Sequence, residues 1–319
     1  MSSFKSKLIY YTLRNRHLFR LHLKPEVWDW NTSIPAFRQI CEEGSARMKL
    51  PEGIQVLPVT IEGVTGIDNR QAEWLIPAGA PTDKVILYTL GGGYVSGSCK
   101  DHRAMVAKIA AGAGVKILMF DHRLAPEYPF PAALDDAVNA YRWLLAQGFS
   151  PPDIMIVGES AGGGLCLATL LALRDQGIPL PAAAVAMSPW TDLALTGESY
   201  KTKLAASIDP PGMSMVCSKY YVRENDRRNP WISPLYGDLH GLPPLFICVG
   251  TYETMLDDSI RFAEKAKAAE VDVTLSVWDK MVHCFPLMAP LFPEATQALD
   301  EICKFIIQKL DVSLALIGN

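Results

Sequence analysis

Short apolar segments alternate with amphipathic helical segments along most of this chain, and this alternation constrains its fold more than any other feature. The apolar, β-rich runs begin near residue 71 and are separated by stretches long enough for a helix. Strands separated by helices of about 10–15 residues form crossover units of a mainly parallel sheet, with helices covering its faces. The expected strands are 85–90, 115–120, 154–157, 182–187, 245–249 and 273–278, and the expected helices are 132–145, 165–174, 255–269 and 295–310. The sequence therefore predicts an α/β fold.

Two stretches interrupt this alternation. Residues 1–50 look helical and amphipathic, and residues 191–235 are irregular and rich in Ser, Pro, Tyr and Met. Ligands of open α/β sheets bind outside the carboxyl ends of the strands, so insertions at that edge cover the site. We therefore expect both stretches to form a cap over a catalytic domain made of residues 51–190 and 236–319.

The charge balance argues against a nucleic-acid partner. The 319 residues contain 30 Lys and Arg against 34 Asp and Glu, a net charge of −4, whereas proteins that bind a duplex usually present a basic face. The first 24 residues are the exception, because six basic residues there have no acidic neighbour: Lys5, Lys7, Arg14, Arg16, Arg20 and Lys24. We interpret them as the solvated face of a helix, with attraction to an acidic partner or a lipid surface as the alternative.

The sequence shows no targeting or membrane-spanning pattern. Charges interrupt every apolar run of the first 24 residues, and no stretch reaches the roughly 18 uninterrupted apolar residues of a membrane span. The seven cysteines show no C-x-x-C spacing, and several lie in apolar runs. Reduced, buried thiols are typical of cytoplasmic proteins. We therefore expect a cytoplasmic location and no transmembrane segment.

The segment Gly158-Glu-Ser160-Ala-Gly162 is a G-x-S-x-G motif that lies between an apolar strand and a helix. Small residues two positions before and after the serine allow a sharp turn, which projects the serine hydroxyl above the edge of the sheet. The N-terminus of the following helix favours negative charge at the same place. Ser160 is therefore the predicted nucleophile.

A serine hydroxyl needs a general base, and chains with this turn place the histidine last, after the acid. Two histidines follow Ser160 in the sequence. His240 precedes a predicted strand and so lies at the wrong end of it, whereas His283 follows the last strand and reaches the carboxyl edge. His283 is therefore the predicted base.

The acid that orients the imidazole should follow a strand between the serine and the histidine. Glu253 is the acidic residue nearest to the end of strand 245–249 and is preferred. Asp257 is the alternative, although acidic residues one turn into a helix commonly complement its N-terminus. Asp192 is expected to be structural.

The run Gly91-Gly92-Gly93 follows a predicted strand and can expose backbone N–H groups without an intervening side chain. Together with the N–H of Ala161, such groups can bind the oxyanion of a tetrahedral intermediate. The run lacks the Gly-Lys-Ser/Thr ending of a phosphate-binding loop and the last glycine of a dinucleotide-binding loop. An oxyanion hole is therefore the preferred interpretation.

Several motifs occur in an order that resembles the bacterial hormone-sensitive-lipase family of α/β-hydrolases. They are Asp-His-Arg-Leu-Ala-Pro-Glu-Tyr-Pro-Phe-Pro from residue 121, Gly-Glu-Ser-Ala-Gly-Gly from residue 158, Ser-Pro-Trp-Thr-Asp from residue 188, and Met-Val-His-Cys-Phe from residue 281. The resemblance covers residues 85–285. It implies an α/β-hydrolase fold, the triad Ser160, Glu253 and His283, and oxyanion donors at Gly92, Gly93 and Ala161.

The chain departs from the family pattern at three positions. Leu90 stands where the family usually has a histidine before the glycines, which puts the rigidity of the glycine loop in doubt. Glu253 replaces the more frequent aspartate of the triad, and Glu159 replaces the aspartate that commonly precedes the nucleophile. None of these changes removes the triad.

These features together predict a serine carboxylesterase that acts on a small ester through an acyl-enzyme on Ser160. No metal or organic cofactor is required, because the triad supplies the nucleophile. Apolar residues of the second cap segment are expected to line the pocket: Met213, Met215, Tyr220 and Tyr221. The covered pocket and the family resemblance imply acyl groups of about two to eight carbons.

Two other functions remain open at this point. The same triad serves amidases and peptidases, because fold and triad do not fix the substrate. Plant gibberellin receptors resemble this family without its catalytic histidine; retention of His283 argues against a receptor, and Leu90 is the feature in its favour. The resemblance also implies pairing of two copies along strand 273–278, so a homodimer is expected.

Overall fold

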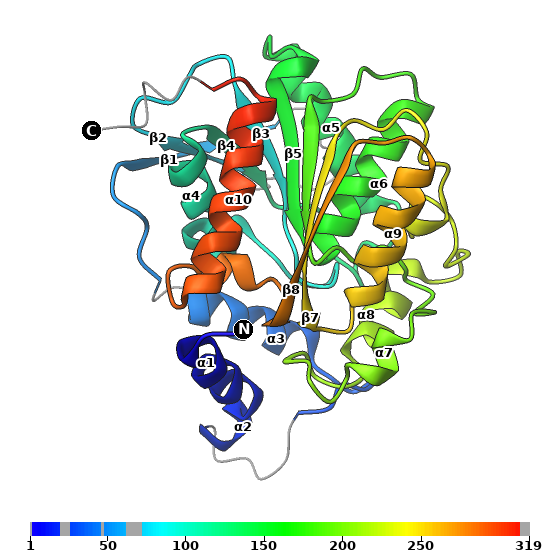
Figure 1. Ribbon diagram of the computed structural model, residues 1–319. Helices are drawn as coiled ribbons and strands as arrows, with labels where there is room; N and C mark the ends of the chain where they lie inside the picture. The colour runs from blue at the N-terminus through cyan, green and yellow to red at the C-terminus, as the bar shows by residue number, and fades with distance from the viewer. Residues whose placement is uncertain (1, 20–25, 46–47, 62–71, 313–319) are drawn as a thin grey trace.

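The computed structural model describes residues 2–19, 26–45, 48–61 and 72–312. Within these residues, one eight-stranded sheet has the order β1-β2-β4-β3-β5-β6-β7-β8 (Figure 1). The strands are β1 (Ile54–Val59), β2 (Ala72–Pro77), β3 (Val85–Thr89), β4 (Lys116–Phe120), β5 (Ile154–Glu159), β6 (Ala183–Met187), β7 (Leu245–Tyr252) and β8 (Val273–Val282). β2 is antiparallel to both of its neighbours, β1 and β4, whereas β3 to β8 are all parallel to one another. The predicted α/β architecture is confirmed.

Helices cover both faces of the sheet (Figure 1). On one face, α4 (Cys99–Ala113) and α10 (Pro293–Lys309) share a core with the sheet residues that point toward them. On the other face, α5 (Ala132–Ala146), α6 (Ala161–Asp175) and α9 (Leu256–Ala268) do the same. The carboxyl ends of the parallel strands therefore lie at one edge between two layers of helices.

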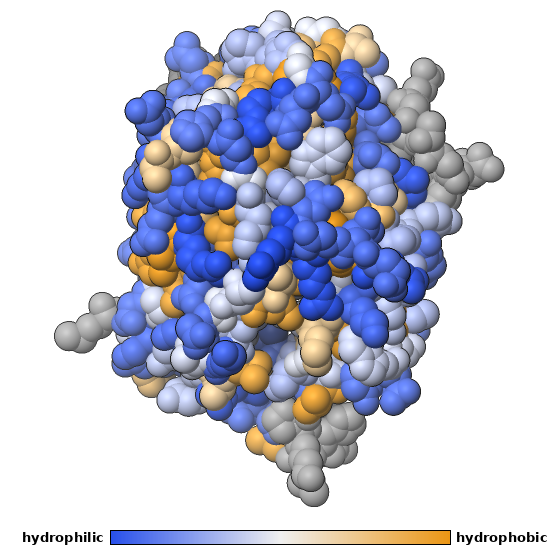
Figure 2. Space-filling model, turned by 90° about the vertical axis from the view of Figure 1, so that its right-hand side faces the viewer, coloured by the Kyte–Doolittle hydropathy of each residue, from blue (hydrophilic) through white to orange (hydrophobic). Residues whose placement is uncertain are grey.

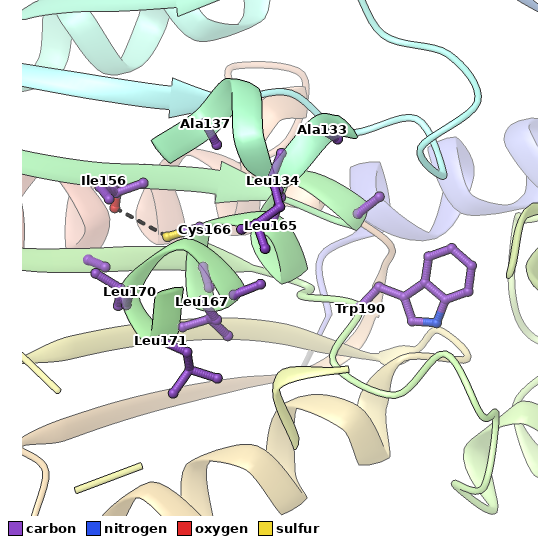
Figure 3. Packing of buried hydrophobic residues seen from close by; sticks show 14 of the residues in the cluster. Ala133, Leu134, Ala137, Ile156, Leu165, Cys166, Leu167, Leu170, Leu171 and Trp190 are labelled. Carbon is purple, nitrogen blue, oxygen red and sulfur yellow. Dashed lines mark hydrogen bonds between the residues drawn. The ribbon is translucent and has the colours of Figure 1, made fainter. Parts of the chain in front are cut away.

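The helix α6 is buried on almost every side, and its burial fixes the start of the helix in place. All its residues from Ala161 to Leu173 are buried. Figure 3 shows Leu165, Leu167 and Leu170 packed among neighbouring apolar side chains, with the Cys166 thiol directed at the backbone carbonyl of Ile156, 3.6 Å away. A helix held this tightly is a rigid base for a residue at its N-terminus.

The structure contains elements that the sequence pattern did not predict. β1 and β2 extend the sheet at its first edge, and the apolar pattern of β1 is weak because most of its residues face solvent. The helix α4 was also missed, although Ser98 and Asp101 form a capping box at its start. β8 continues to Val282, beyond the expected end at residue 278.

The two stretches that interrupt the alternation contain helices joined by irregular segments, and they contact one another. The first holds α1 (Phe4–Arg14), α2 (Arg16–Phe19) and α3 (Ile34–Ser45), and the second holds α7 (Ser199–Thr202) and α8 (Met213–Val222). Short 3-10 turns occur at Pro151–Asp153, Pro234–Tyr236 and Phe285–Met288. The backbone N–H of Trp28 donates to the carbonyl of Pro211 at 2.8 Å, which joins the two stretches.

Arg20 and Lys24 of the basic N-terminal segment lie outside the described residues. Among the helices of the described ranges, none has both the length and the apolar character needed to cross a membrane.

Candidate active site

Ser160 lies at the turn between β5 and α6 in a strained backbone conformation, with a φ of +56°. The turn is tight on both sides. A Cβ atom at Gly158 would lie 2.3 Å from Thr89 Oγ1, and one at Gly162 would lie 2.1 Å from the carbonyl oxygen of Thr89. Positions 158 and 162 must therefore both be glycine for the turn to pass this close to β3, as the motif predicts.

The predicted triad residues form a continuous hydrogen-bonded chain. Ser160 Oγ lies 2.8 Å from His283 Nε2, and His283 Nδ1 lies 2.7 Å from Glu253 Oε2. With the ring proton on Nδ1, the imidazole donates to the carboxylate and accepts from the serine hydroxyl. This is the geometry that a general base needs to take the serine proton.

Glu253 is fully buried, and its second carboxylate oxygen is fixed by two donors. Oε1 accepts from the Ser188 hydroxyl at 2.9 Å and from the backbone N–H of Gly250 at 2.6 Å. The Ser188 oxygen also accepts from the backbone N–H of Cys284 at 3.1 Å. Ser188 therefore links the acid to the residue after His283, a role that the sequence analysis did not identify.

The other acidic residues near this strand end accept hydrogen bonds from backbone N–H groups. Asp257 accepts from the N–H of Ser199, and Asp258 accepts from the N–H groups of Thr191 and Asp192. The Asp192 carboxylate in turn accepts from nearby N–H groups and from Arg261. Of the acids considered for the triad, Glu253 is the one placed at His283.

His240 lies in an exposed turn, where its ring contacts Asp238 at 2.6 Å. It takes no part in the hydrogen-bonded chain that ends at Ser160.

The surroundings of His283 shift its pKa. Burial lowers the pKa, but the carboxylates of Asp209 and Glu253 outweigh this effect and raise it well above the usual value. Burial also raises the pKa of the Cys284 thiol. A base must be neutral to accept a proton, so the acidic side of any pH profile should lie above pH 6.5.

The glycine run forms a tight loop beside Ser160. Gly92 and Gly93 have φ values of +113° and +67°, which disfavour any residue with a side chain. A Cβ atom at Gly92 would lie 2.3 Å from the carbonyl oxygen of Ser96. All three glycines of the run border the same cavity as Ser160 and His283.

A buried charge network supports this loop from behind. The backbone N–H of Gly91 donates to Glu159 Oε1 at 2.7 Å, and His102 Nε2 lies 2.9 Å from the same oxygen. His102 Nδ1 contacts the Asp101 carboxylate, which also caps α4. Burial lowers the pKa of His102, but the Glu159 and Asp101 carboxylates raise it to about 10, so this imidazole is charged at neutral pH.

His102 and Asp101 were not among the predicted site residues. The available signal was the start of an unrecognised helix, because Ser98 followed three residues later by Asp101 is a helix-capping pattern.

The cavity at Ser160 has a volume of about 470 Å³ and is lined largely by flexible apolar side chains. Its apolar lining includes Met48, Met105, Met213, Met255, Met288, Leu287 and Leu291, and its ionisable lining includes Lys49, His102, Lys108, Glu159 and Asp209. Methionine adapts to ligands of different shape because its side chain is unbranched and polarisable.

Only one of the four residues expected in the pocket wall lies there. Met213 lines the cavity, whereas the expectation for the other three is wrong. Met215 is exposed, Tyr220 contacts the Trp30 ring, and Tyr221 is buried in a stack on Tyr94 with 3.8 Å between the ring centroids. Helix α8 presents only one side to the cavity, and that side carries Met213 and Cys217, one turn apart.

Among the residues that the structure describes, no three His, Cys, Asp or Glu side chains are grouped so that they could hold a metal ion. The site thus joins a serine hydroxyl, an imidazole that contacts it, a carboxylate that contacts the imidazole, and a glycine loop that borders the same cavity. Such a site suits acyl transfer from a carbonyl substrate to serine.

Comparisons with known proteins identify the family to which this sequence and fold are similar. A family model described as the α/β hydrolase fold matches residues 86–287. An acetyl-hydrolase of Streptomyces hygroscopicus is 41% identical over 245 residues, which cover 76% of this chain and 81% of the relative.

Two solved structures are similar over almost the whole chain. The crystal structure of EstE5 soaked with p-nitrophenyl butyrate has a TM-score of 0.87 and 39% identity, and covers 98% of this chain and 100% of its own. An esterase of the bacterial hormone-sensitive lipase family has a TM-score of 0.87 and 40% identity, with 97% and 99% covered.

Proposed function

This chain belongs to the α/β-hydrolase family, among the esterases related to bacterial hormone-sensitive lipase, and we propose that it hydrolyses carboxylic esters through a covalent acyl-enzyme on Ser160. The hydrogen-bonded chain from Ser160 through His283 to Glu253 supports this proposal most directly. It joins a hydroxyl, a base and a carboxylate in the order that nucleophilic catalysis requires.

In the first half of the reaction, Ser160 Oγ attacks the ester carbonyl carbon while its proton passes to His283 Nε2. The carbonyl π-electrons move to oxygen, and the resulting oxyanion is bound by the N–H groups of Gly92, Gly93 and Ala161. As the tetrahedral intermediate collapses, the C–O bond to the alcohol breaks and His283 returns the proton to the leaving oxygen. Glu253 stabilises the imidazolium throughout.

In the second half, water takes the place of the alcohol. Its oxygen attacks the acyl carbon while His283 accepts one of its protons, and collapse of the second intermediate releases the acid and restores the Ser160 hydroxyl. The donors are fixed before the reaction, so they stabilise charge that appears only in the transition states.

We also assign a cap to residues 1–50 and 191–235. Both stretches supply residues to the cavity wall, Met48 from the first and Met213 and Asp209 from the second. Their contact with one another through Trp28 and Pro211 supports their treatment as one cover over the carboxyl edge.

The cavity argues for short and medium acyl groups. A volume of about 470 Å³ is at the lower end of ordinary ligand pockets, and it must hold both the acyl and the alcohol parts of the ester. We expect the highest kcat/KM for acyl chains of about two to eight carbons. A p-nitrophenyl ester panel tests this range, and faster hydrolysis of a sixteen-carbon than of a four-carbon acyl chain would contradict it.

The central test compares wild type, Ser160→Ala and Ser150→Ala on p-nitrophenyl acetate and butyrate. Ser150 is exposed and its side chain makes no capping hydrogen bond, so its variant is a matched control. We expect Ser160→Ala to lose at least about 10³-fold in kcat and Ser150→Ala to retain it. Equal rates for all three proteins would refute the proposal.

Two further measurements separate this function from its alternatives. A fluorophosphonate probe should label wild type and Ser150→Ala at Ser160, whereas a non-catalytic receptor would not react. The p-nitroanilide of butyric acid tests amide cleavage, and we expect the ester to be hydrolysed faster than this amide.

A further inference from the structure

The N-terminal helix α1 packs on the rest of the protein through one face. Ser6 is buried, and its hydroxyl lies 3.3 Å from Glu294. Ile9 and Tyr10 pack against the core shared with α4 and α10, and the Tyr10 ring lies 5.1 Å from that of Tyr252. The inner face of α1 therefore has its partner within the fold.

The outer face of α1 carries a ridge of large apolar side chains. Phe4, Leu8 and Tyr11 are 80%, 56% and 60% exposed. Their spacing of four and three residues places them side by side on one side of the helix, opposite Ser6 and Ile9. Exposed apolar residues are ordinary when scattered, but three in a row on one helix form a patch.

Basic residues lie on both sides of this ridge. At 100° per residue, Lys5 falls on one side of the Phe4–Leu8–Tyr11 line, and Lys7 and Arg14 fall on the other. All three are exposed. No Asp or Glu occurs before Glu26 in the sequence, so α1 itself supplies no charge to neutralise them.

The helix is held beside the entrance of the cavity. The Ser3 backbone N–H and hydroxyl both donate to the Glu294 carboxylate, the latter at 2.8 Å. Leu291, three residues before Glu294, lines the cavity at Ser160 and is itself exposed. Figure 1 shows α1 and α2 below the sheet, at the end where β7 and β8 finish. The face drawn in Figure 2 is mostly hydrophilic, with hydrophobic residues also at this lower end.

We propose that the outer face of α1 docks the protein on an anionic lipid surface, with the entrance of the cavity turned toward the lipid. An apolar ridge with basic side chains on both of its sides is the pattern of helices that lie in the interface of a bilayer. The ridge would enter the boundary between headgroups and acyl chains, while the basic side chains contact acidic headgroups.

A second copy of the chain fits this surface poorly. Two copies related by a two-fold axis would bring Lys5, Lys7 and Arg14 near the same residues of the partner, where like charges repel. Three exposed side chains also offer much less than the roughly 800 Å² per partner of a stable interface. The proposal does not depend on the chemistry at Ser160.

Sedimentation with vesicles tests the proposal. The full chain is mixed with vesicles of phosphatidylcholine alone or with added phosphatidylglycerol, at low and high salt. We expect partition onto the anionic vesicles only, weakened by salt. Lys5→Glu/Lys7→Glu should lower the partition coefficient at least twentyfold, since each basic side chain near an anionic surface contributes about fivefold. Phe4→Ser/Leu8→Ser/Tyr11→Ser should lower it at least as much.

Matched controls carry the same changes elsewhere on the surface. Lys267→Glu/Lys304→Glu alters two exposed lysines of α9 and α10, and Ile40→Ser/Leu57→Ser/Leu204→Ser alters three exposed apolar residues of α3, β1 and the turn after α7. Both should bind vesicles as wild type does, and hydrolysis of p-nitrophenyl acetate in solution should be unchanged in every variant.

Three results would overturn the proposal. Wild type that stays in the supernatant with anionic vesicles has no lipid-docking surface. Equal binding by the α1 variants and wild type places the docking surface elsewhere. A change from dimer to monomer in the α1 variants, without vesicle binding by wild type, assigns the face to a second copy. Because esterase activity is measured beside binding, none of these results is confused with loss of the catalytic site.

Discussion

Removal of the charge at His102 should damage catalysis although this residue borders the cavity without contacting the triad. The imidazole stands between Asp101 and Glu159, and Glu159 holds the Gly91 N–H at 2.7 Å. In His102→Gln, two buried carboxylates lose the cation between them, and the Glu159 side chain is expected to turn away from Asp101. Gly91 then loses a fixed partner, and the donors at Gly92 and Gly93 shift with it.

The structure sets the size of the effect. Deletion of one oxyanion donor costs about 10²- to 10³-fold in kcat; here the donors are loosened rather than removed, so we expect a loss of about ten- to a hundredfold in kcat. KM should change little, because the oxyanion exists only in the transition state. The broken buried charge pair should also lower the free energy of unfolding by about 3–5 kcal/mol.

The test is kcat on p-nitrophenyl butyrate, calculated per active site, with the active sites counted by complete labelling with a fluorophosphonate. This value separates a misplaced oxyanion loop from a loss of folded protein. A variant that is merely unstable has fewer sites with normal kcat. The double variant His102→Gln/Glu159→Gln removes both charges of that pair. Its loss in free energy of unfolding should be smaller than the sum of the losses in the two single variants. Wild-type kcat per titrated site in His102→Gln would refute the reasoning.

The same pair makes a prediction for stability against pH. The pKa of His102 is raised from 6.5 to about 10, so its stabilising contribution is complete below pH 6.5 and is lost as the pH rises through about 10. The difference in melting temperature between wild type and His102→Gln should therefore narrow across this range. A constant difference would show that the imidazole is not charged in the folded protein.

Three further predictions concern the acid, the base and the last strand. Ser188→Ala removes one of the two donors to Glu253 Oε1, and kcat should fall about tenfold at unchanged KM in steady-state assays; no change would show that Gly250 suffices. Asp209→Asn removes a negative charge that raises the pKa of His283, so the acidic limb of kcat/KM should move to lower pH, and an unmoved limb would contradict that cause. Two copies are expected to pair along β8, an edge strand. Sedimentation of wild type should show particles of twice the chain mass, and the fraction of such particles should be smaller in Val277→Asp. Wild type that sediments only as single chains would refute the dimer.

The central strands could be predicted because their residues are buried on both faces. β3, β5 and β6 are entirely buried, so each appears in the sequence as an unbroken apolar run. In β1, exposed and partly buried residues mix without full burial at any position, and Pro58 interrupts the run, so no clear strand pattern results. Edge strands depend on their neighbour for stability, and the neighbour β2 is also absent from the expected strands.

The residues of the candidate site also fall into those that the sequence could predict and those that it could not. Ser160, Glu253 and His283 could be chosen because each follows a recognisable strand, and parallel strands bring their carboxyl ends to one edge. The contacts of Ser188 with Glu253 and of His102 with Glu159 join residues 65 and 57 positions apart. No local pattern encodes such a contact, because it depends on how helices and loops pack against the finished sheet.

The departure at Leu90 has a structural consequence that the sequence alone could not supply. Leu90 is buried in the core beneath the sheet edge, so it contributes packing and no hydrogen bond from its side chain. The loop is instead held through Glu159, which is the chain neighbour of Ser160 and binds Gly91, the chain neighbour of Gly92. One carboxylate thus connects the nucleophile to the oxyanion loop. The cap contacts the same loop from the other side, because a Cβ at Gly93 would lie 2.8 Å from Cys217 Sγ and Arg38 donates to the carbonyl of Val95. Substitution of a cap residue that lines the cavity, such as Met213, should therefore change which esters bind, whereas substitution of Glu159 or His102 should weaken the stabilisation of the oxyanion.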